Sequence, residues 1–466
     1  MKISNNALNF LLAQYRAIFK RAYVKGIASA VLLTAGLAAG QAQAAAIYLN
    51  GTPNELPTTG QIANITGNST DPSGAYDPET GDGEFTYLNI NSGDALELNG
   101  EVIIKSGAAQ ANASSNRILG TNEIGITGEG RLTIAIDSNG NPATDGLLVI
   151  SNGETVSVNI DTIDVQKGLL EIRDSSTSSG DATVGADTIT IGSGNGSAKV
   201  ALIASSTNKT VTLGNAVSSD ESGSDITVSE NGVLNLQGTG ASGTQVVGKS
   251  LTIGANGVML TDAGAANKVS TSNLTVETDG FKVITTDTTK ETFAGHTAEI
   301  AGNLLIGSGA SWVVAATNDP ATDDVIEGTT TFKSGSNTQI GGTLTVSGGK
   351  LTVETGAGLF ATEASAGSSK AGTIEVTKNG TDSGTLVISS ADLKDFLNAK
   401  DTSGNAITYS EIKTNDDDKY IVDTETDPAP EADKGSILLS GGILELSDIN
   451  RIDLADGFIL NQYRQS

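Results

Sequence analysis

The stretch ITVSENGVLNL, residues 226–236, decides the fold. Apolar and polar residues alternate on both sides of Asn231-Gly232, which is the pattern of strands that bury one face each. Glycine and asparagine accept the backbone conformation that a tight turn requires. The stretch therefore predicts a short strand, a turn and a second short strand.

This pattern recurs along much of the chain, with clear copies at 88–98, 163–172, 251–260, 344–353 and 438–446. Some neighbouring copies start 25 residues apart (Ile226 to Leu251), 23 apart (Leu251 to Leu274) and 30 apart (Leu274 to Leu304). A period of about 20 to 30 residues is typical of a parallel β-helix, in which each coil buries its inward side chains by stacking on its neighbours. We therefore predict an all-β chain that forms a right-handed parallel β-helix (β-solenoid) with degenerate coils.

The competing interpretation is a series of antiparallel hairpins that build sandwich domains, because Asn-Gly between alternating strands is a strong hairpin signal. Three features of the whole chain favour the solenoid. Trp312 is the single tryptophan, linkers do not recur at the spacing of separate domains, and Thr, Asn, Val and Ile recur where stacked ladders would place them. Both arrangements remain open at this point.

The sequence divides into five segments. Residues 1–44 are a predicted signal peptide, and 45–83, rich in Pro, Gly, Asn and Asp, are a predicted irregular N-terminal cap. Residues 84–388 carry the solenoid pattern. Residues 389–436 form a helix-containing acidic excursion, since Ser389-Ser-Ala-Asp392 matches a capping box and an acidic, Pro-containing loop follows. Residues 437–466 are predicted to supply the final solenoid strands.

Composition excludes several classes of function. The formal net charge is −27, which disfavours binding to nucleic acid. Cysteine is absent, so the chain has no disulfide, thiolate ligand or thiol nucleophile. Aromatic residues make up 4% of the chain, so its core must be built from smaller side chains.

Residues that carry chemistry are sparse. His296 is the single histidine, and in FAGHTAEI it follows a glycine in a predicted turn, which favours a surface position over catalysis. The run Asp416-Asp417-Asp418 lacks EF-hand spacing, so we interpret it as a solvated loop and not as a calcium site. The glycine-rich stretch 192–197 (GSGNGS) lacks the Asp of a calcium-binding nonapeptide repeat, and 240–243 (GASG) lacks the lysine of a phosphate-binding loop. We name no catalytic, cofactor-binding or metal-binding residue, and we expect no enzyme and no cofactor.

The first residues have the features of an export signal. Residues 1–25 carry only positive charge, 27–39 (IASAVLLTAGLAA) are apolar, and Ala42-Gln43-Ala44 supplies a small-x-small cleavage pattern. The apolar run is too short to span a bilayer, which needs about 20 residues. Before it, residues 8–26 (LNFLLAQYRAIFKRAYVKG) are amphipathic at helical spacing.

This long bipartite leader, together with the repeats, the acidity and the low aromatic content, resembles autotransporter (type V secretion) passengers of Gram-negative bacteria. The resemblance implies a bacterial surface adhesin exported through the inner membrane to the cell surface or the medium. Such proteins usually end in a transmembrane translocator barrel. Here the end is DGFILNQYRQS, without the amphipathic strands of that barrel, so a separate outer-membrane translocator is an expected partner.

Three functions follow, in this order of preference. The first is an adhesin or stalk whose polar Thr, Ser and Asn face binds glycans or proteins on host or sibling cells. The second is a structural surface-layer protein that associates with itself through uncapped stack ends. The third is a carbohydrate-active β-helix enzyme with two facing carboxylates. Basic partners for such carboxylates are scarce, since the arginines beyond the leader are Arg117, Arg131, Arg173, Arg451 and Arg464.

Overall fold

The structure is a computed structural model. It describes the backbone of the strands β1 to β10 between residues 46 and 151. It also describes residues 156–447 apart from 175–180, 195, 206–208, 218–221, 239–242, 265, 286–287, 316, 319–324, 327, 363–371, 399–407, 416–418 and 429–434. Contacts divide the chain into residues 1–45 and 46–466, and the description below concerns the second unit.

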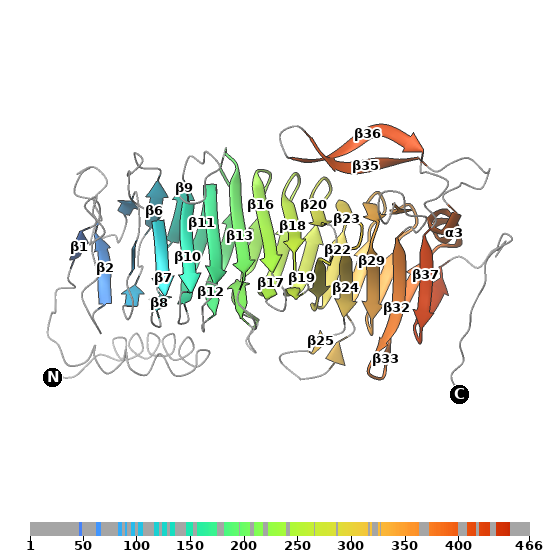
Figure 1. Ribbon diagram of the computed structural model, residues 1–466, viewed down its shortest axis with the longest axis horizontal. Helices are drawn as coiled ribbons and strands as arrows, with labels where there is room; N and C mark the ends of the chain where they lie inside the picture. The colour runs from blue at the N-terminus through green and yellow to red at the C-terminus, as the bar shows by residue number, and fades with distance from the viewer. Residues whose placement is uncertain are drawn as a thin grey trace, which may run out of the picture. The chain divides into compact units, whose positions relative to one another are not determined.

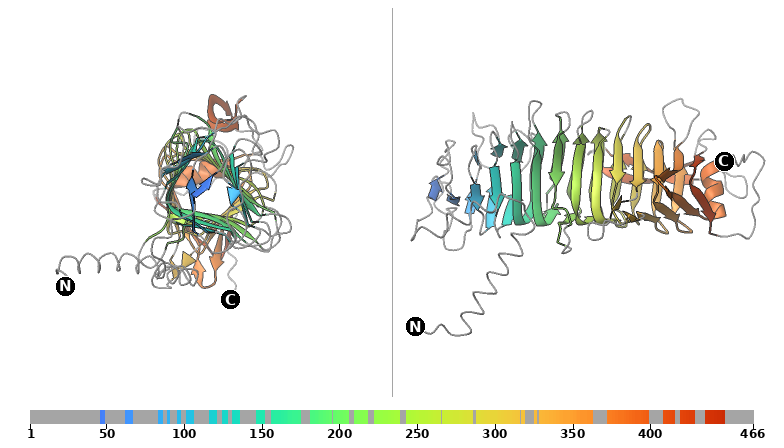
Figure 2. Two further views of the ribbon diagram at one scale, coloured as in Figure 1. Left: turned by 90° about the vertical axis from the view of Figure 1, so that its left-hand side faces the viewer. Right: turned by 90° about the horizontal axis from the view of Figure 1, so that it is seen from below.

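The described residues form an all-β structure, as the sequence predicts, with one described helix. Thirty-four of its described strands join into one sheet, in which nearly all pairings are parallel and link one turn of the chain to the next. The strands stack side by side along the unit (Figure 1). Seen along the stack, they surround a common centre (Figure 2).

Three parallel ladders run along the stack. Ladder 1 contains β1 (Ala46–Tyr48), β2 (Ile62–Thr66), β5 (Ala95–Glu97), β8 (Ile124–Thr127), β11 (Val156–Asp174), β12 (Ala182–Ile191), β14 (Thr210–Leu213), β17 (Gly243–Ile253), β19 (Asn267–Val276), β21 (Lys290–Phe293), β24 (Ser311–Ala315), β29 (Thr343–Ser347), β32 (Thr373–Asn379) and β37 (Ser436–Ser440).

Ladder 2 uses later parts of β11, β12, β17 and β19, because these long strands bend and serve more than one ladder. Its other members are β3 (Gly83–Phe85), β6 (Glu101–Lys105), β9 (Arg131–Ala135), β15 (Asp225–Val228), β22 (Thr297–Ile300), β27 (Thr329–Phe332), β30 (Lys350–Val353), β34 (Thr385–Ile388) and β38 (Ile443–Leu446).

Ladder 3 contains the end of β11 together with β4 (Asn89–Ile90), β7 (Asn116–Gly120), β10 (Gly146–Ser151), β13 (Ala198–Ala204), β16 (Gly232–Gly238), β18 (Val258–Ala263), β20 (Phe281–Ile284), β23 (Asn303–Ile306), β28 (Asn337–Ile340) and β31 (Gly358–Ala361). Three short antiparallel pairs also occur among the described strands: β25 (Thr317–Asn318) with β26 (Val325–Ile326), β32 with β33 (Asp382–Ser383), and β35 (Thr408–Thr414) with β36 (Tyr420–Pro428).

The register tests the predicted repeat spacing. Ile226 pairs with Leu251, and Leu251 pairs with Leu274, so the 25- and 23-residue steps are confirmed. The third step is wrong, because Leu274 pairs with Ala298, whereas Leu304 lies on ladder 3. Ala298 is small and lies between polar residues, so its strand has a weaker apolar pattern than the run that begins at Leu304.

The hairpin interpretation fails at the turn that suggested it. Strand β15 ends before this turn and β16 begins at Gly232, yet the two strands do not pair with each other. Each pairs in parallel with strands of the turns before and after. Equivalent turns of later repeats place Asn256 and Asp279 at φ 58° and 64°. Asn and Asp tolerate this left-handed conformation better than other non-glycine residues. The Asn-Gly signal therefore marks a corner between ladders 2 and 3.

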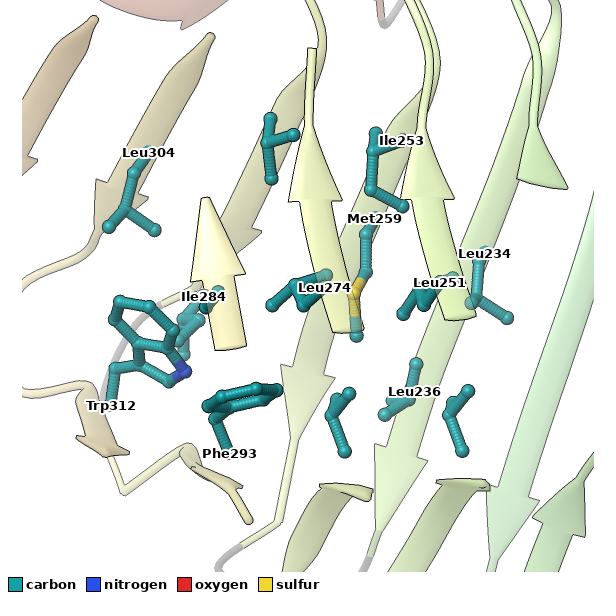
Figure 3. Close-up of a cluster of buried hydrophobic side chains, with 14 of the residues drawn as sticks. Leu234, Leu236, Leu251, Ile253, Met259, Leu274, Ile284, Phe293, Leu304 and Trp312 are labelled. Atoms are coloured by element: carbon teal, nitrogen blue, oxygen red, sulfur yellow. The ribbon is translucent and has the colours of Figure 1, made fainter. Parts of the chain in front are cut away.

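Inward side chains of successive strands form one long hydrophobic core, in which aliphatic residues predominate (Figure 3). In ladder 2, Ile226, Leu251 and Leu274 follow one another in register and are each 0–1% exposed. Burying one such side chain contributes about 1.5–3 kcal/mol relative to leaving it exposed. No single strand can bury its face alone, so stability depends on contact between neighbouring turns.

Helix α3 (Ser390–Asn398) follows β31 and β34 near the end of the described stack, and it contacts β31. The N-cap of the predicted capping box is confirmed, because the backbone N–H of Asp392 donates to Ser389 Oγ at 3.0 Å. The two side chains are also linked, since Ser389 Oγ donates to Asp392 Oδ2 at 2.5 Å. Leu393 and Phe396 are 4% and 1% exposed and belong to the main core. The helix therefore covers core side chains near the end of ladder 3.

Two segments differ from the sequence prediction. Within 389–436, the acidic excursion contains the antiparallel hairpin β35–β36, whose strands flank the Asp416–Asp418 run instead of forming an irregular loop. Within 45–83, where an irregular cap was expected, β1 and β2 pair in parallel. Their short lengths, between residues rich in Gly and Pro, explain why no alternating pattern is visible there.

Candidate contact surfaces

Mostly small polar side chains, together with a few charged ones, form two rows on the outer face of ladder 2. Registered strands bring residues of successive turns next to each other, about 4.8 Å apart. We call these rows the threonine face. The first row is Thr188, Asp225, Ser250, Asn273, Thr297, Thr329, Lys350 and Thr385, and the second is Thr190, Thr227, Thr252, Thr275, Glu299, Thr331 and Thr352.

The threonine face is partly to fully solvent-exposed, in contrast to the buried residues that alternate with it. Neighbouring rungs also bond to each other, since Ser250 Oγ donates to Asp225 Oδ1 at 2.6 Å. Hydroxyls act as both donors and acceptors, so such a face can hydrogen-bond to sugar hydroxyls or to peptide groups. Its regular spacing suits a ligand that is itself long or repetitive.

A charged triad interrupts the threonine face. Lys333 Nζ lies 3.2 Å from Glu299 Oε1 and 3.3 Å from Glu354 Oε1. The backbone N–H of Ser334 donates to Glu354 Oε2 at 3.1 Å, and this bond together with Lys333 lowers the pKa of Glu354. Hydrogen bonds to Glu299 and Glu354 raise the pKa of Lys333.

The outer face of ladder 3 differs, because it carries an apolar stripe. Val258, Phe281 and Val283 point outward there, yet they are 8%, 5% and 1% exposed. The hairpin β35–β36 covers them and forms a second core cluster, in which Ile412 is 4% exposed. Figure 1 shows the hairpin lying along the stack beside these strands.

Hydrogen bonds and ring packing hold the hairpin in place. The Gln339 side-chain amide donates to Ser410 O at 2.7 Å and accepts from the backbone N–H of Ile412 at 3.3 Å. The rings of Phe281 and Tyr420 are 6.4 Å apart between centroids. Burial raises the pKa of the Tyr420 hydroxyl, with a further contribution from Asp262. The hairpin thus bridges several turns of the stack.

A polar cluster lies inside the core, where the sequence analysis expected aliphatic residues. Lys282 and Glu291 are both fully buried and form an ion pair. Thr261 Oγ1 donates to Glu291 Oε2. A signal for Lys282 was present: it stands two residues after the turn glycine Gly280, the same offset as inward Leu234 from Gly232. The flanking Phe281 and Val283 masked this signal, because alternation predicts that these apolar residues point inward and that Lys282 points outward.

Of the residues considered for chemistry, the structure describes His296. His296 lies half-buried in the bend before β22, and its backbone N–H donates to Ser272 O at 3.1 Å. The run Asp416–Asp418 lies outside the described residues. Within the described part of the chain, no group of three His, Cys, Asp or Glu side chains could hold a metal ion. The helix that the structure describes is not long and apolar enough to cross a membrane.

No protein-family model, curated protein or solved structure matches the chain. Its function must therefore be inferred from its own residues and faces.

Proposed function

We propose that the chain is an exported surface protein of a Gram-negative bacterium, a right-handed parallel β-helix that serves as an adhesive stalk similar to an autotransporter passenger. The observation that carries this proposal is the threonine face, a solvent-accessible polar strip that runs from Thr190 to Thr352 and contains one charged triad around Lys333. Its rungs offer repeated hydroxyls and few charges. The proposed ligands are glycans or proteins on host or sibling cells, and a separate outer-membrane translocator is the proposed export partner.

The contrast between faces supports the assignment of the contact surface. The apolar stripe of ladder 3 is covered by the chain's own hairpin, so it is not free for a partner. The outer face of ladder 1 mixes polar residues with the apolar Val313 and Leu438. Ladder 2 therefore presents the most uniform polar surface among the described strands.

The test is binding of the purified protein to epithelial cells and to a glycan array. The triple variant Thr227→Ala, Thr252→Ala, Thr275→Ala removes three successive hydroxyls of the threonine face, and we expect it to lose at least tenfold in apparent affinity. Each substitution is at the surface and changes stability by no more than about 0.5 kcal/mol. A matched control, Thr212→Ala with Thr345→Ala, changes outward threonines of ladder 1 and should bind as the parent does. Equal loss in both variants, or no binding by the parent, contradicts the proposal.

A second candidate function is self-assembly into a surface layer, and the last described strands favour it. Outward Leu438 and Ile443 are 50% and 46% exposed, and β37 and β38 form the last described rungs of ladders 1 and 2. Exposed apolar residues on a strand edge promote pairing with another chain. Electron microscopy of the concentrated protein would show ordered filaments or arrays, and Leu438→Lys should abolish them. Monodisperse single particles at all concentrations would exclude this function.

A further inference from the structure

The buried pair Lys282 and Glu291 is unusual for its surroundings. Lys282 extends inward from β20 of ladder 3. The residues that pair with it on the preceding and following strands are Met259 and Leu304. Glu291 extends inward from β21 of ladder 1, and Trp312 pairs with it on the following strand, β24. The two side chains therefore meet across the interior of the stack, with no solvent exposure.

The lysine amine is held against the carboxyl group by its neighbours. Lys282 Nζ donates to Glu291 Oε1, lies 3.6 Å from Met259 Sδ, and is 5.6 Å from the centre of the Trp312 ring. Thr261 Oγ1 donates to the other carboxyl oxygen, Glu291 Oε2. Met259 and Trp312 both point into the core (Figure 3). Removing both charged groups from water is costly, and their attraction alone often fails to compensate for it.

We propose that Lys282 and Glu291 condense to an intramolecular amide. A proton passes from the ammonium to the carboxylate along their hydrogen bond, which leaves an uncharged amine facing a carboxylic acid. The amine nitrogen attacks the carboxyl carbon, a C–N bond forms and one C–O bond breaks. The departing oxygen takes one proton from the acid and one from the amine and leaves as water. The reaction needs no oxidant, reductant or second substrate.

Three physical features favour this step. Fixing the two groups in contact removes most of the entropic barrier of a bimolecular reaction. The hydroxyl of Thr261 donates to the oxygen on which negative charge develops during attack, so it is a positioning residue for the reaction. The apolar interior favours the uncharged amide product over two buried charges. The product links ladders 1 and 3 covalently in a chain that has no cysteine for a disulfide.

Mass spectrometry of the full-length protein tests the proposal. Loss of one water lowers the intact mass in denaturant by about 18 Da relative to the sequence of the same polypeptide. Trypsin cannot cleave after an acylated lysine, so the digest should contain residues 269–290 joined to residues 291–333, as one branched peptide. Linear peptides 269–282 and 283–290 should be missing.

Two variants assign the bond. Lys282→Arg should keep the full unlinked mass and yield linear peptides, whereas Lys290→Arg, which changes the exposed lysine next to Glu291, should still lose one water. Thr261→Val should slow the appearance of the lower mass after synthesis. An unmodified intact mass with the linear peptides recovered would overturn the proposal, as would an equal loss of water in Lys282→Arg.

Discussion

Truncating Ile412 to alanine should make the hairpin β35–β36 open more often without unfolding the stack. Ile412 is 4% exposed and packs on the apolar stripe of ladder 3. The substitution removes three buried carbon atoms, and at about 0.8 kcal/mol for each it costs about 2.4 kcal/mol. Because every 1.4 kcal/mol is a factor of ten, the open hairpin becomes about 50-fold more populated. Local units of this kind open independently of the global fold.

Hydrogen exchange followed by mass spectrometry measures this opening. Peptides from the hairpin should exchange about 50-fold faster in Ile412→Ala, whereas peptides from ladder 2 should not change. Ile421→Ala is a matched control, since this isoleucine lies on the same hairpin but outside the second core cluster, and its hairpin exchange should stay near that of the parent. If both variants exchange alike, the contact with ladder 3 does not hold the hairpin.

Three further changes test other parts of the fold. Leu251→Ala should lower the free energy of unfolding in urea by about 2–5 kcal/mol, because it opens a cavity in a column of the core, whereas Thr252→Ala on the outer face should change it by less than about 0.5 kcal/mol. Ser389→Ala should cost about 1 kcal/mol by removing the cap of α3, seen as faster amide exchange in that helix, and unchanged exchange would contradict the cap. The third change concerns pH. Folding lowers the pKa of Glu354 from its ordinary value of 4.5, so the stabilisation by this carboxylate is present above pH 4.5 and is lost as the pH falls through the folded pKa. Folding raises the pKa of Lys333 from 10.5, so the stabilisation by this ammonium is present below pH 10.5 and is lost as the pH rises through the folded pKa. The difference in urea midpoint between the parent and Glu354→Gln should therefore be constant from pH 5 to 9 and shrink on acidification, and a difference that persists at pH 2 would contradict this assignment.

Local alternation in the sequence was sufficient to predict the strands and their stacking partners where every inward residue is a large aliphatic. Ile226, Leu251 and Leu274 are such residues, and their predicted spacing matches the register. The capping box at Ser389 was also visible, because a helix N-terminus depends on a few neighbouring residues. Ala298 was missed because a small side chain gives a weak apolar signal.

Contacts between distant segments were not visible in the sequence. The hairpin packs on strands far away in the chain, and this contact makes the outward residues Phe281 and Val283 as buried as core residues. Apolar residues on both faces remove the period-2 signal, so the inward position of Lys282 was hidden. The sequence predicts a polar face of Thr, Ser and Asn but does not place it on ladder 2; the register that aligns its residues comes from the structure.

Distances between spin labels along the threonine face test the parallel stack most directly, and the absence of cysteine lets labels be placed at chosen sites. Pairs that join Thr190 to Glu299, to Thr331 and to Thr352 span four, five and six strand steps. At about 4.8 Å for each step, the expected separations are about 19, 24 and 29 Å. A regular increase of about 5 Å for each turn is the predicted result. Separations that do not increase along this series would contradict the stack.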